Sequence, residues 1–365
     1  MLITHTDVFR LSIPIHPFTI ATGTMYFAQN IFIRIHTNNN LYGVGECSAF
    51  PMIVGETQNT CFVMARDFAG IWKGKDPLDI ESRMKELHTY AAGNSTIKSA
   101  FDMALYDIAA KHAGKPLYRF LEGNKKRMLT DLTIGIDSPA NMAKEAVKFK
   151  EDGVQIIKVK LGKNPVDDIE RVKQIRDAIG YDIPLRVDAN QGWDPEAAAM
   201  TLAALAPYQI EFCEQPMRRY NDHRLPELRK KSPIPIMADE SVFDHHDAER
   251  VIKSNGCDFV NIKLSKSSGI LEAVKINEVC RQHHIPCMVG CMMESRVALS
   301  AFAHFAASSD NIRFYDMDTS LMGLREDPVE GGIQFNNYHI ELPDSTGIGA
   351  DVNNDFLATQ ESFTV

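Results

Sequence analysis

Between residues 130 and 316, short apolar segments alternate eight times with amphipathic ones. The apolar segments predict strands at Leu132–Ile136, Val154–Lys160, Ile183–Asp188, Ile210–Glu214, Pro235–Asp239, Phe259–Lys263, Cys287–Gly290 and Arg313–Asp316. The predicted helices between them include Pro139–Glu151, Pro165–Ile179, Pro195–Ala206 and Ile270–His283, the first three with a capping residue before a first-turn proline. Such units imply parallel strands covered by helices. We therefore expect an α/β fold, a (β/α)₈-type TIM barrel over residues 126–325, with an open doubly wound sheet as the alternative.

The first 125 residues follow a different pattern. The predicted elements are strands near Val8–Pro14 and Ile31–His36, a turn and return strand at Leu41–Glu46, a helix start at Asp76-Pro77, and a helix over Ser95–His112 that Gly114 ends. This order predicts an N-terminal α+β capping domain over residues 1–125. The tail, residues 326–365, has one strand-like segment at Tyr338–Leu342 and is expected to complete that domain.

Three acids and two lysines stand at the ends of consecutive predicted strands. Asp188, Glu214 and Asp239 end the third, fourth and fifth strands, 26 and 25 residues apart. Lys160 and Lys263 end the second and sixth. Because alternate side chains share one face of a strand, these ionic groups point into the barrel if their apolar neighbours face the helices. Active sites of such barrels lie at this C-terminal rim.

Three converging carboxylates would raise one another's pKa unless a cation lay between them. An oxygen-only ligand set favours a hard divalent ion, and we expect one Mg²⁺ per subunit. A helix cap or a rim salt bridge could explain any one of these acids, but three with matching parity favour a shared site. Lys160 and Lys263 are opposed in a ring of eight strands, which suits a proton-transfer pair. Lys158 shares a face with Lys160 and, as a second cation, would lower the pKa of that amine.

At these residues the chain resembles the enolase superfamily, in its muconate-lactonizing subgroup. The motifs that carry the resemblance are Lys158-Val159-Lys160, Asp188-Ala189-Asn190, Glu214-Gln215-Pro216, Ala238-Asp239-Glu240-Ser241 and Lys263. The resemblance implies an enolase-like modified barrel with a capping domain. It also implies that Asp188, Glu214 and Asp239 bind Mg²⁺ and that Lys160 and Lys263 are the acid/base pair.

A further segment narrows the expected activity. Asp316-Met317-Asp318, at the end of the eighth predicted strand, resembles the Asp-x-Asp signature of dipeptide epimerases, which implies that Asp316 and Asp318 bind a substrate ammonium group. Thr133 is another candidate for substrate binding. We expect epimerisation at the α-carbon of the C-terminal residue by two-base 1,1-proton transfer through an enediolate. The alternatives are a cycloisomerase or an o-succinylbenzoate synthase-type dehydratase of the same superfamily, and a non-enzymatic, metal-stabilised binding protein.

The N-terminal hairpin suggests which dipeptides are used. Relatives that act on Ala-Glu can carry an arginine in the capping loop, whereas this chain has Gly23 at the matching position and no Lys or Arg from Leu11 to Ile33. Burying an unpaired glutamate side chain there would cost several kcal/mol. Met25 and Tyr26 belong to an apolar group that suggests a pocket, although such residues also form domain cores. We expect Gly23, Met25 and Tyr26 to contact the substrate and a hydrophobic second residue to be preferred.

Bulk composition excludes several classes of protein. A net charge of −9 argues against a nucleic-acid-binding surface, and no uninterrupted apolar stretch could span a bilayer. The seven cysteines include no C-x-x-C pair, which is typical of reduced thiols in a cytoplasmic protein. The first residues lack a signal-peptide pattern. The expected partners are a small dipeptide and, by family analogy, further copies of the chain in a homo-oligomer.

Overall fold

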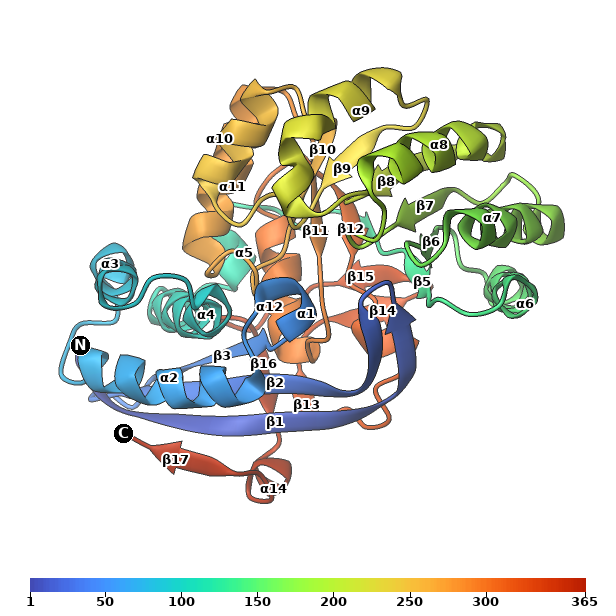
Figure 1. Cartoon of the computed structure of the whole chain (residues 1–365). Helices are drawn as coiled ribbons and strands as arrows, with labels where there is room; N and C mark the ends of the chain where they lie inside the picture. Colours follow the sequence, from blue (N-terminus) through green and yellow to red (C-terminus); the bar gives the residue numbers. More distant parts are fainter.

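Eight parallel strands wrapped by helices form the larger part of the molecule (Figure 1). They are β5 (Leu132–Ile134), β6 (Ile157–Lys160), β7 (Leu185–Asp188), β8 (Ile210–Glu214), β9 (Ile236–Ala238), β10 (Phe259–Ile262), β11 (Cys287–Gly290) and β12 (Ile312–Asp316). The computed structural model describes residues 1–365. Spatial order follows chain order, and the Asp131 N–H donates to Tyr315 O (3.2 Å) where the two edge strands meet. The sheet is thus nearly closed, which confirms the barrel prediction and rules out the doubly wound sheet.

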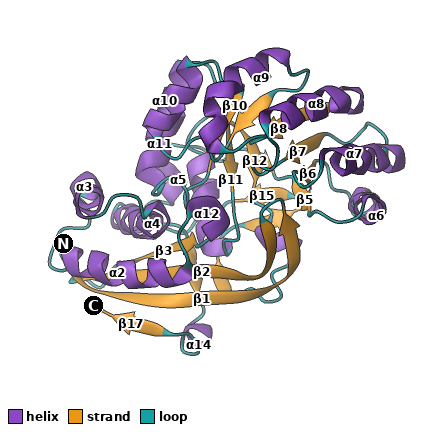
Figure 2. Ribbon diagram, viewed as in Figure 1, coloured by secondary structure: helices purple, strands orange, loops and turns teal.

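The covering helices are α6 (Pro139–Glu151), α7 (Pro165–Ile179), α8 (Pro195–Leu205), α9 (Leu225–Lys231), α10 (His245–Lys253), α11 (Ile270–Gln282), α12 (Arg296–Ala306) and the short α13 (Thr319–Met322). Three of them, α6, α7 and α8, begin where the sequence predicts caps. Ser138, Asn164 and Asp194 each accept a hydrogen bond from a backbone N–H of the first turn. Figure 2 shows these helices surrounding the sheet. None of the helices combines the length and the apolar content that a bilayer crossing needs.

Residues of the barrel strands divide between two apolar clusters according to strand parity. Phe212, Met237 and Met288 form a small buried cluster inside the barrel, whereas the alternate residues of the same strands belong to the main core under the helices. Arg186 lies within the barrel, with its guanidinium 5.2 Å from the ring centres of Phe212 and of Phe314. The predicted parity is therefore confirmed, and the ionic strand ends share the inner face.

The N-terminal lobe is an antiparallel sheet covered by helices. Its strands, in the order β17-β1-β2-β3, are β1 (Ile3–Ile20), β2 (Gly23–Thr37), β3 (Tyr42–Ser48) and β17 (Ser362–Thr364). Its helices are α1 (Pro51–Val54), α2 (Gln58–Trp72), α3 (Ile80–Tyr90), α4 (Ser95–His112) and α5 (Leu117–Phe120). β1 and β2 exceed their predicted lengths because they pair with each other almost from end to end, so polar positions outside the apolar segments are also held extended.

One predicted helix start is wrong. The helix expected to begin at Asp76-Pro77 begins instead at Ile80, with Asp79 as the N-cap that accepts from the Ser82 N–H. The Asp76 carboxylate accepts from the Leu78 N–H (3.1 Å). Asp76 therefore closes a local turn, a common alternative use of an Asp that precedes proline.

The C-terminal tail contacts both parts of the molecule. Its elements are β13 (Val329–Gly331), β14 (Gln334–Asn336), β15 (His339–Glu341), β16 (Ala350–Val352), α14 (Asn354–Leu357) and β17. β15 pairs with β4 (Met128–Leu129), which precedes the barrel, and β17 pairs with β1 of the lobe. The division of the chain near residue 125, with residues 326–365 completing the lobe, stays a prediction.

Several hydrogen bonds join the lobe to the barrel, and two groups of them lie near the barrel mouth and the hairpin. Glu46 of β3 is fully buried and accepts hydrogen bonds from the Ser295 N–H and hydroxyl and from the Ala298 N–H, at the start of α12. The β1–β2 hairpin has an irregularity between Pro14 and Phe18. There the His16 N–H donates to Gly323 O (3.1 Å) and the Arg325 N–H donates to Pro14 O (2.9 Å). The hairpin is thus bonded to the segment that follows α13.

Candidate active site

Three carboxylates converge at the C-terminal ends of β7, β8 and β9. Asp188, Glu214 and Asp239 are all fully buried, and Asp188 and Glu214 are direct cross-strand partners. Lys158 Nζ lies 3.4 Å from Asp188 Oδ2 and 2.7 Å from Glu214 Oε2. Lys263 Nζ lies 3.8 Å from Glu214 Oε1 and 2.8 Å from Asp239 Oδ2. Each lysine thus joins two successive acids, as expected for a single cluster.

Lys160 and Lys263 stand at the two ends of this cluster. Lys160 Nζ lies 2.6 Å from Asp188 Oδ2, whereas Lys263 contacts Asp239, the acid at the other end. Their strands, β6 and β10, are separated by β7, β8 and β9 in a nearly closed ring of eight. The two amines therefore approach the acids from opposite sides of the barrel mouth.

Burial and neighbouring charges shift the pKa values of the cluster in different directions. Burial, with Asp188 adding to it, raises the pKa of Glu214 to about 7. Burial also acts to raise the pKa of Asp239, but Lys263 and Lys266 outweigh it and hold that pKa well below its usual range. Burial opposes the charge of Lys158, but Asp316, Glu214 and Asp188 outweigh it and raise the pKa of this amine well above its usual value. The cluster is thus held together by buried, mutually compensating charges.

The acids fit a magnesium ion. Glu214 Oε2 and Asp239 Oδ2 are buried oxygens that receive no hydrogen bond, although each has an ammonium group at ion-pair distance. A buried carboxylate oxygen without a hydrogen bond has a free lone pair for a cation. Oxygen is also the donor that Mg²⁺ prefers. Asp188, Glu214 and Asp239 are the residues that would hold the ion.

Asp316 and Asp318 form a second acidic group beside the first. Asp316 Oδ2 accepts from Lys158 Nζ (2.7 Å), and Asp318 Oδ2 accepts from the Thr133 N–H (2.8 Å). One ligand atom of Asp316, one of Asp318 and Cys291 Sγ lie within 4.8 Å of one another. Burial, with Asp316 adding to it, raises the pKa of Asp318 to about 6. No cationic side chain is paired with Asp318, so this carboxylate could accept a positive group from a ligand.

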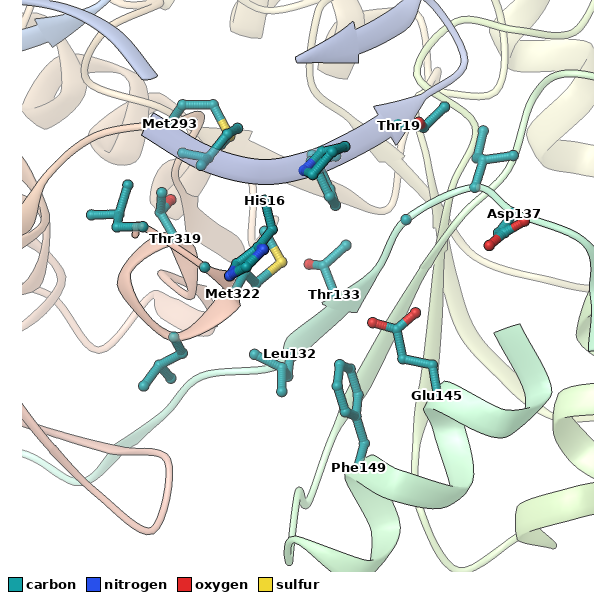
Figure 3. Close-up of a pocket in the computed structure, with 18 of the residues that line it drawn as sticks. His16, Thr19, Leu132, Thr133, Asp137, Glu145, Phe149, Met293, Thr319 and Met322 are labelled. Carbon is teal, nitrogen blue, oxygen red and sulfur yellow. The ribbon is translucent and has the colours of Figure 1, made fainter. Parts of the chain in front are cut away.

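A cavity of about 680 Å³ is lined in part by Thr133, whose backbone contacts Asp318. Figure 3 shows it between β1, β5, α6 and α13, with Met293 and Thr319 on one side, Glu145 and Phe149 on the other, and Thr133 between them. Thr133 lines the cavity and also donates its N–H to Asp318, so the acid pair lies behind this part of the cavity wall. Asp316, Asp318, Lys160 and Lys263 are not among the lining residues.

A smaller cavity, of about 260 Å³, lies under the lobe hairpin. Met25, Tyr26, Phe50 and Met52 are among its lining residues, and Met293 lines both cavities. Tyr26 is 59% exposed, so its ring is at the opening and not in a core. A Cβ atom at Gly23 would lie 2.8 Å from Met52 Sδ, so Met52 occupies the space that a side chain at Gly23 would need. The residues predicted for the hairpin site thus gather around one apolar space.

Two contributors to the ionic cluster were not assigned from the sequence. Lys266 is fully buried, and its Nζ lies 2.7 Å from Asp239 Oδ1. Asn261 Nδ2 donates to Glu214 Oε1 (2.8 Å). Asn261 stands two residues before Lys263, so strand alternation gives both side chains the same inward direction. Lys266 lies in the turn after β10, where strand parity no longer applies.

Comparison with known proteins identifies families for both parts of the chain. Residues 3–122 match the N-terminal domain model of mandelate racemase / muconate lactonizing enzymes, and residues 141–356 match the enolase C-terminal domain-like model. The D-Ala-D/L-Ala epimerase of Cytophaga hutchinsonii is 44% identical over the whole of both chains. The hydrophobic dipeptide epimerase of Enterococcus faecalis is 40% identical over 91% of this chain and 94% of its own.

Solved structures give the same grouping. The crystal structure of the Cytophaga hutchinsonii dipeptide epimerase, complexed with Mg and D-Ala-L-Val, matches with a TM-score of 0.99 over all of both chains, at 44% identity. The Enterococcus faecalis dipeptide epimerase, complexed with Mg and L-Leu-L-Tyr, matches with a TM-score of 0.93 over 96% of this chain and all of its own, at 39% identity. These similarities cover both the lobe and the barrel.

Proposed function

The chain belongs to the mandelate racemase / muconate lactonizing enzyme family of the enolase superfamily, and from this premise we propose a role for each residue of the barrel mouth. The protein is an isomerase, a Mg²⁺-dependent dipeptide epimerase. Asp188, Glu214 and Asp239 hold the ion, and Lys160 and Lys263 are the acid/base pair. Both lysines adjoin the acids from opposed strands, which supports this assignment.

The reaction moves one proton off the α-carbon of the C-terminal residue and one proton onto it. When bound, Mg²⁺ supplies positive charge that stabilises the charge developing on the substrate carboxylate. One lysine takes the α-proton, and the lysine on the opposite side delivers a proton to the other face of the now planar carbon. Since inversion needs a proton donor on each face, a pair of opposed amines can interconvert both configurations. Which lysine acts as the base then depends on the configuration of the substrate.

The remaining groups position the dipeptide. Asp316 and Asp318 bind its ammonium group, supported by the burial of both carboxylates and by the lack of a cationic partner at Asp318. Thr133 keeps Asp318 in place through its backbone N–H. The hairpin cavity receives the second residue, and the walls formed by Met25, Tyr26 and neighbouring apolar residues favour hydrophobic side chains over glutamate. The hydrophobic dipeptide epimerase among the relatives supports this preference.

The main support for this proposal is that Lys160 and Lys263 flank the same three carboxylates. Isotope exchange tests the proposal. Incubation of a hydrophobic dipeptide such as L-Ala-L-Leu with the protein and Mg²⁺ in D₂O should place deuterium at the α-carbon of the second residue, with inversion. Formation of an alkene or a lactone without dipeptide exchange would indicate a cycloisomerase or a dehydratase instead. Binding without exchange would indicate a binding protein. A library screen with Ala-Glu as the best substrate by kcat/KM would reject the hydrophobic preference.

We also propose a cytoplasmic location and assembly into a homo-oligomer. All seven cysteines are free and buried, which fits a reducing compartment. Assembly is proposed by analogy with the family alone. Light scattering of the purified chain measures its mass in solution, and a monomeric mass would reject the oligomer.

A further inference from the structure

Glu240 is a buried carboxylate without any partner. Its residue is 1% exposed, and neither Oε1 nor Oε2 receives a hydrogen bond or an ion pair. Other buried acids of the chain with an unbonded oxygen have only one such oxygen; Glu240 has two. Leaving a buried carboxylate without hydrogen bonds is unfavourable, so we expect a donor or a cation to contact Glu240 in the working protein.

The position of Glu240 indicates where that partner would lie. Glu240 directly follows Asp239, in the turn after β9, and the charges that act on it most strongly are those of Asp239, Asp188 and Lys263. It therefore lies close to the acid cluster at the barrel mouth. Burial, with Asp239 and Asp188 adding to it, raises its pKa to about 8.

A permanently neutral carboxylic acid does not explain this site. The O–H of a protonated Glu240 would itself need an acceptor, and neither oxygen of the side chain has a hydrogen-bond partner. An apolar residue would fill the same space at lower cost. The missing partner is therefore a donor or a cation that the polypeptide does not supply.

We propose that Glu240 is a fourth carboxylate of the metal centre and positions the ion's water ligands by accepting hydrogen bonds from them. The inference rests on the proposed function, in which Asp188, Glu214 and Asp239 bind Mg²⁺. Mg²⁺ keeps several water ligands when it binds to proteins, and each of these waters can donate hydrogen bonds. Such donors would satisfy both oxygens of Glu240 at once. Glu240 is thus a positioning residue whose effect is on the affinity for the ion.

Calorimetric titration of Mg²⁺ into the substrate-free protein tests this role. Hydrogen-bond partners of metal ligands typically contribute 10- to 100-fold in affinity, so Glu240→Gln should weaken Mg²⁺ binding by about tenfold or more. The matched control is Glu294→Gln. Glu294 is equally buried, but its oxygens accept from the Ser265 hydroxyl (2.8 Å) and the Met292 N–H (2.6 Å). The control should retain the wild-type affinity within about twofold.

Thermal unfolding adds a readout that a purely structural role would not produce. Without Mg²⁺, Glu240→Gln should melt at or above the wild-type temperature, because the substitution removes an unpaired acid that burial and the neighbouring carboxylates disfavour in its charged form. With saturating Mg²⁺ the order should reverse, since the wild type gains more from the ion. If Glu240→Gln does not fold, Glu240→Asp keeps the charge with a shorter reach and should bind Mg²⁺ less tightly than the wild type.

Equal Mg²⁺ affinity in the wild type and Glu240→Gln would overturn the inference, as would an equal loss in Glu294→Gln. Failure of the inference differs from failure of the proposed function. In the first case the wild type still binds Mg²⁺ and exchanges the α-proton in D₂O. In the second case the wild type shows no exchange.

Discussion

The barrel mouth and the lobe hairpin differ sharply in chemistry. At the mouth, buried acids and lysines at strand ends are joined by ion pairs, and Lys158 alone contacts three carboxylates. Under the hairpin, the cavity is lined by Met25, Tyr26 and Met52, with no ion pair. In the proposed function, the mouth fixes the positions of the reacting groups, whereas the hairpin offers a surface that can change without disturbing them. We infer that the reaction type, set at the mouth, and the choice of substrate, set at the hairpin, can vary separately within one fold.

The largest expected effect comes from removing a reacting amine. Lys160→Ala and Lys263→Ala should each lower the rate of epimerisation by roughly 10²- to 10⁴-fold, because each removes one partner of the proton-transfer pair. Proton NMR in D₂O, started from each configuration of the second residue, measures the exchange. Lys148→Ala is the control, since Lys148 lines the large cavity but its side chain is 71% exposed and paired with Asp152. Full exchange in both variants would reject the two-base scheme.

A smaller effect is expected at the acid pair. Asp318→Asn keeps an acceptor for the Thr133 N–H but removes the charge offered to a substrate ammonium group. A hydrogen bond to a charged group contributes about 1.5–3 kcal/mol, so kcat/KM should fall roughly 10- to 100-fold.

An N-acetylated dipeptide, which lacks the positive charge, provides the control for Asp318. The wild type should discriminate strongly against it, and Asp318→Asn should discriminate much less. Unchanged discrimination in the variant would place the ammonium group elsewhere.

Changing the hairpin should alter the choice of substrate and leave the chemistry in place. Gly23→Arg, combined with Met52→Ala to clear the space next to Gly23, supplies a cation to a cavity that has none. We expect the ratio of kcat/KM for L-Ala-L-Glu over L-Ala-L-Leu to rise about tenfold, through a charge-assisted hydrogen bond. Gly23→Met with Met52→Ala is the matched neutral variant. If both double variants change the ratio alike, charge is not the determinant.

The smallest effect on catalysis is expected where the two regions are joined. Glu46→Gln weakens the acceptor for the Ser295 and Ala298 groups at the start of α12. The free energy of unfolding should fall by about 1–3 kcal/mol, while kcat changes little, because no reacting group is touched. Urea denaturation measures the first quantity and exchange kinetics the second. A loss of kcat comparable to that of Lys160→Ala would show that the junction also orders the mouth.

Regular strands made the core of the site predictable from the sequence. Asp188, Glu214 and Lys263 were assigned because strand alternation and the location of barrel sites fix where a strand-end side chain points. Lys266 and Glu240 lie in turns after strands, and no periodic rule states the direction of their side chains. The helix at Ile80 was misplaced because Asp76 and Asp79 are both able to cap, and only tertiary packing selects between them.

The hydrogen bonds between the hairpin and the segment after α13 would affect how a bound dipeptide is released. Pro14 and His16 are bonded to Arg325 and Gly323, only a few residues beyond Asp318. An outward movement of the hairpin would therefore pull on the stretch that carries Asp316 and Asp318, the acids proposed to bind the substrate ammonium group. The contacts to the second side chain and to the ammonium group of a bound dipeptide would then weaken together. The lysines of the barrel strands would stay in place.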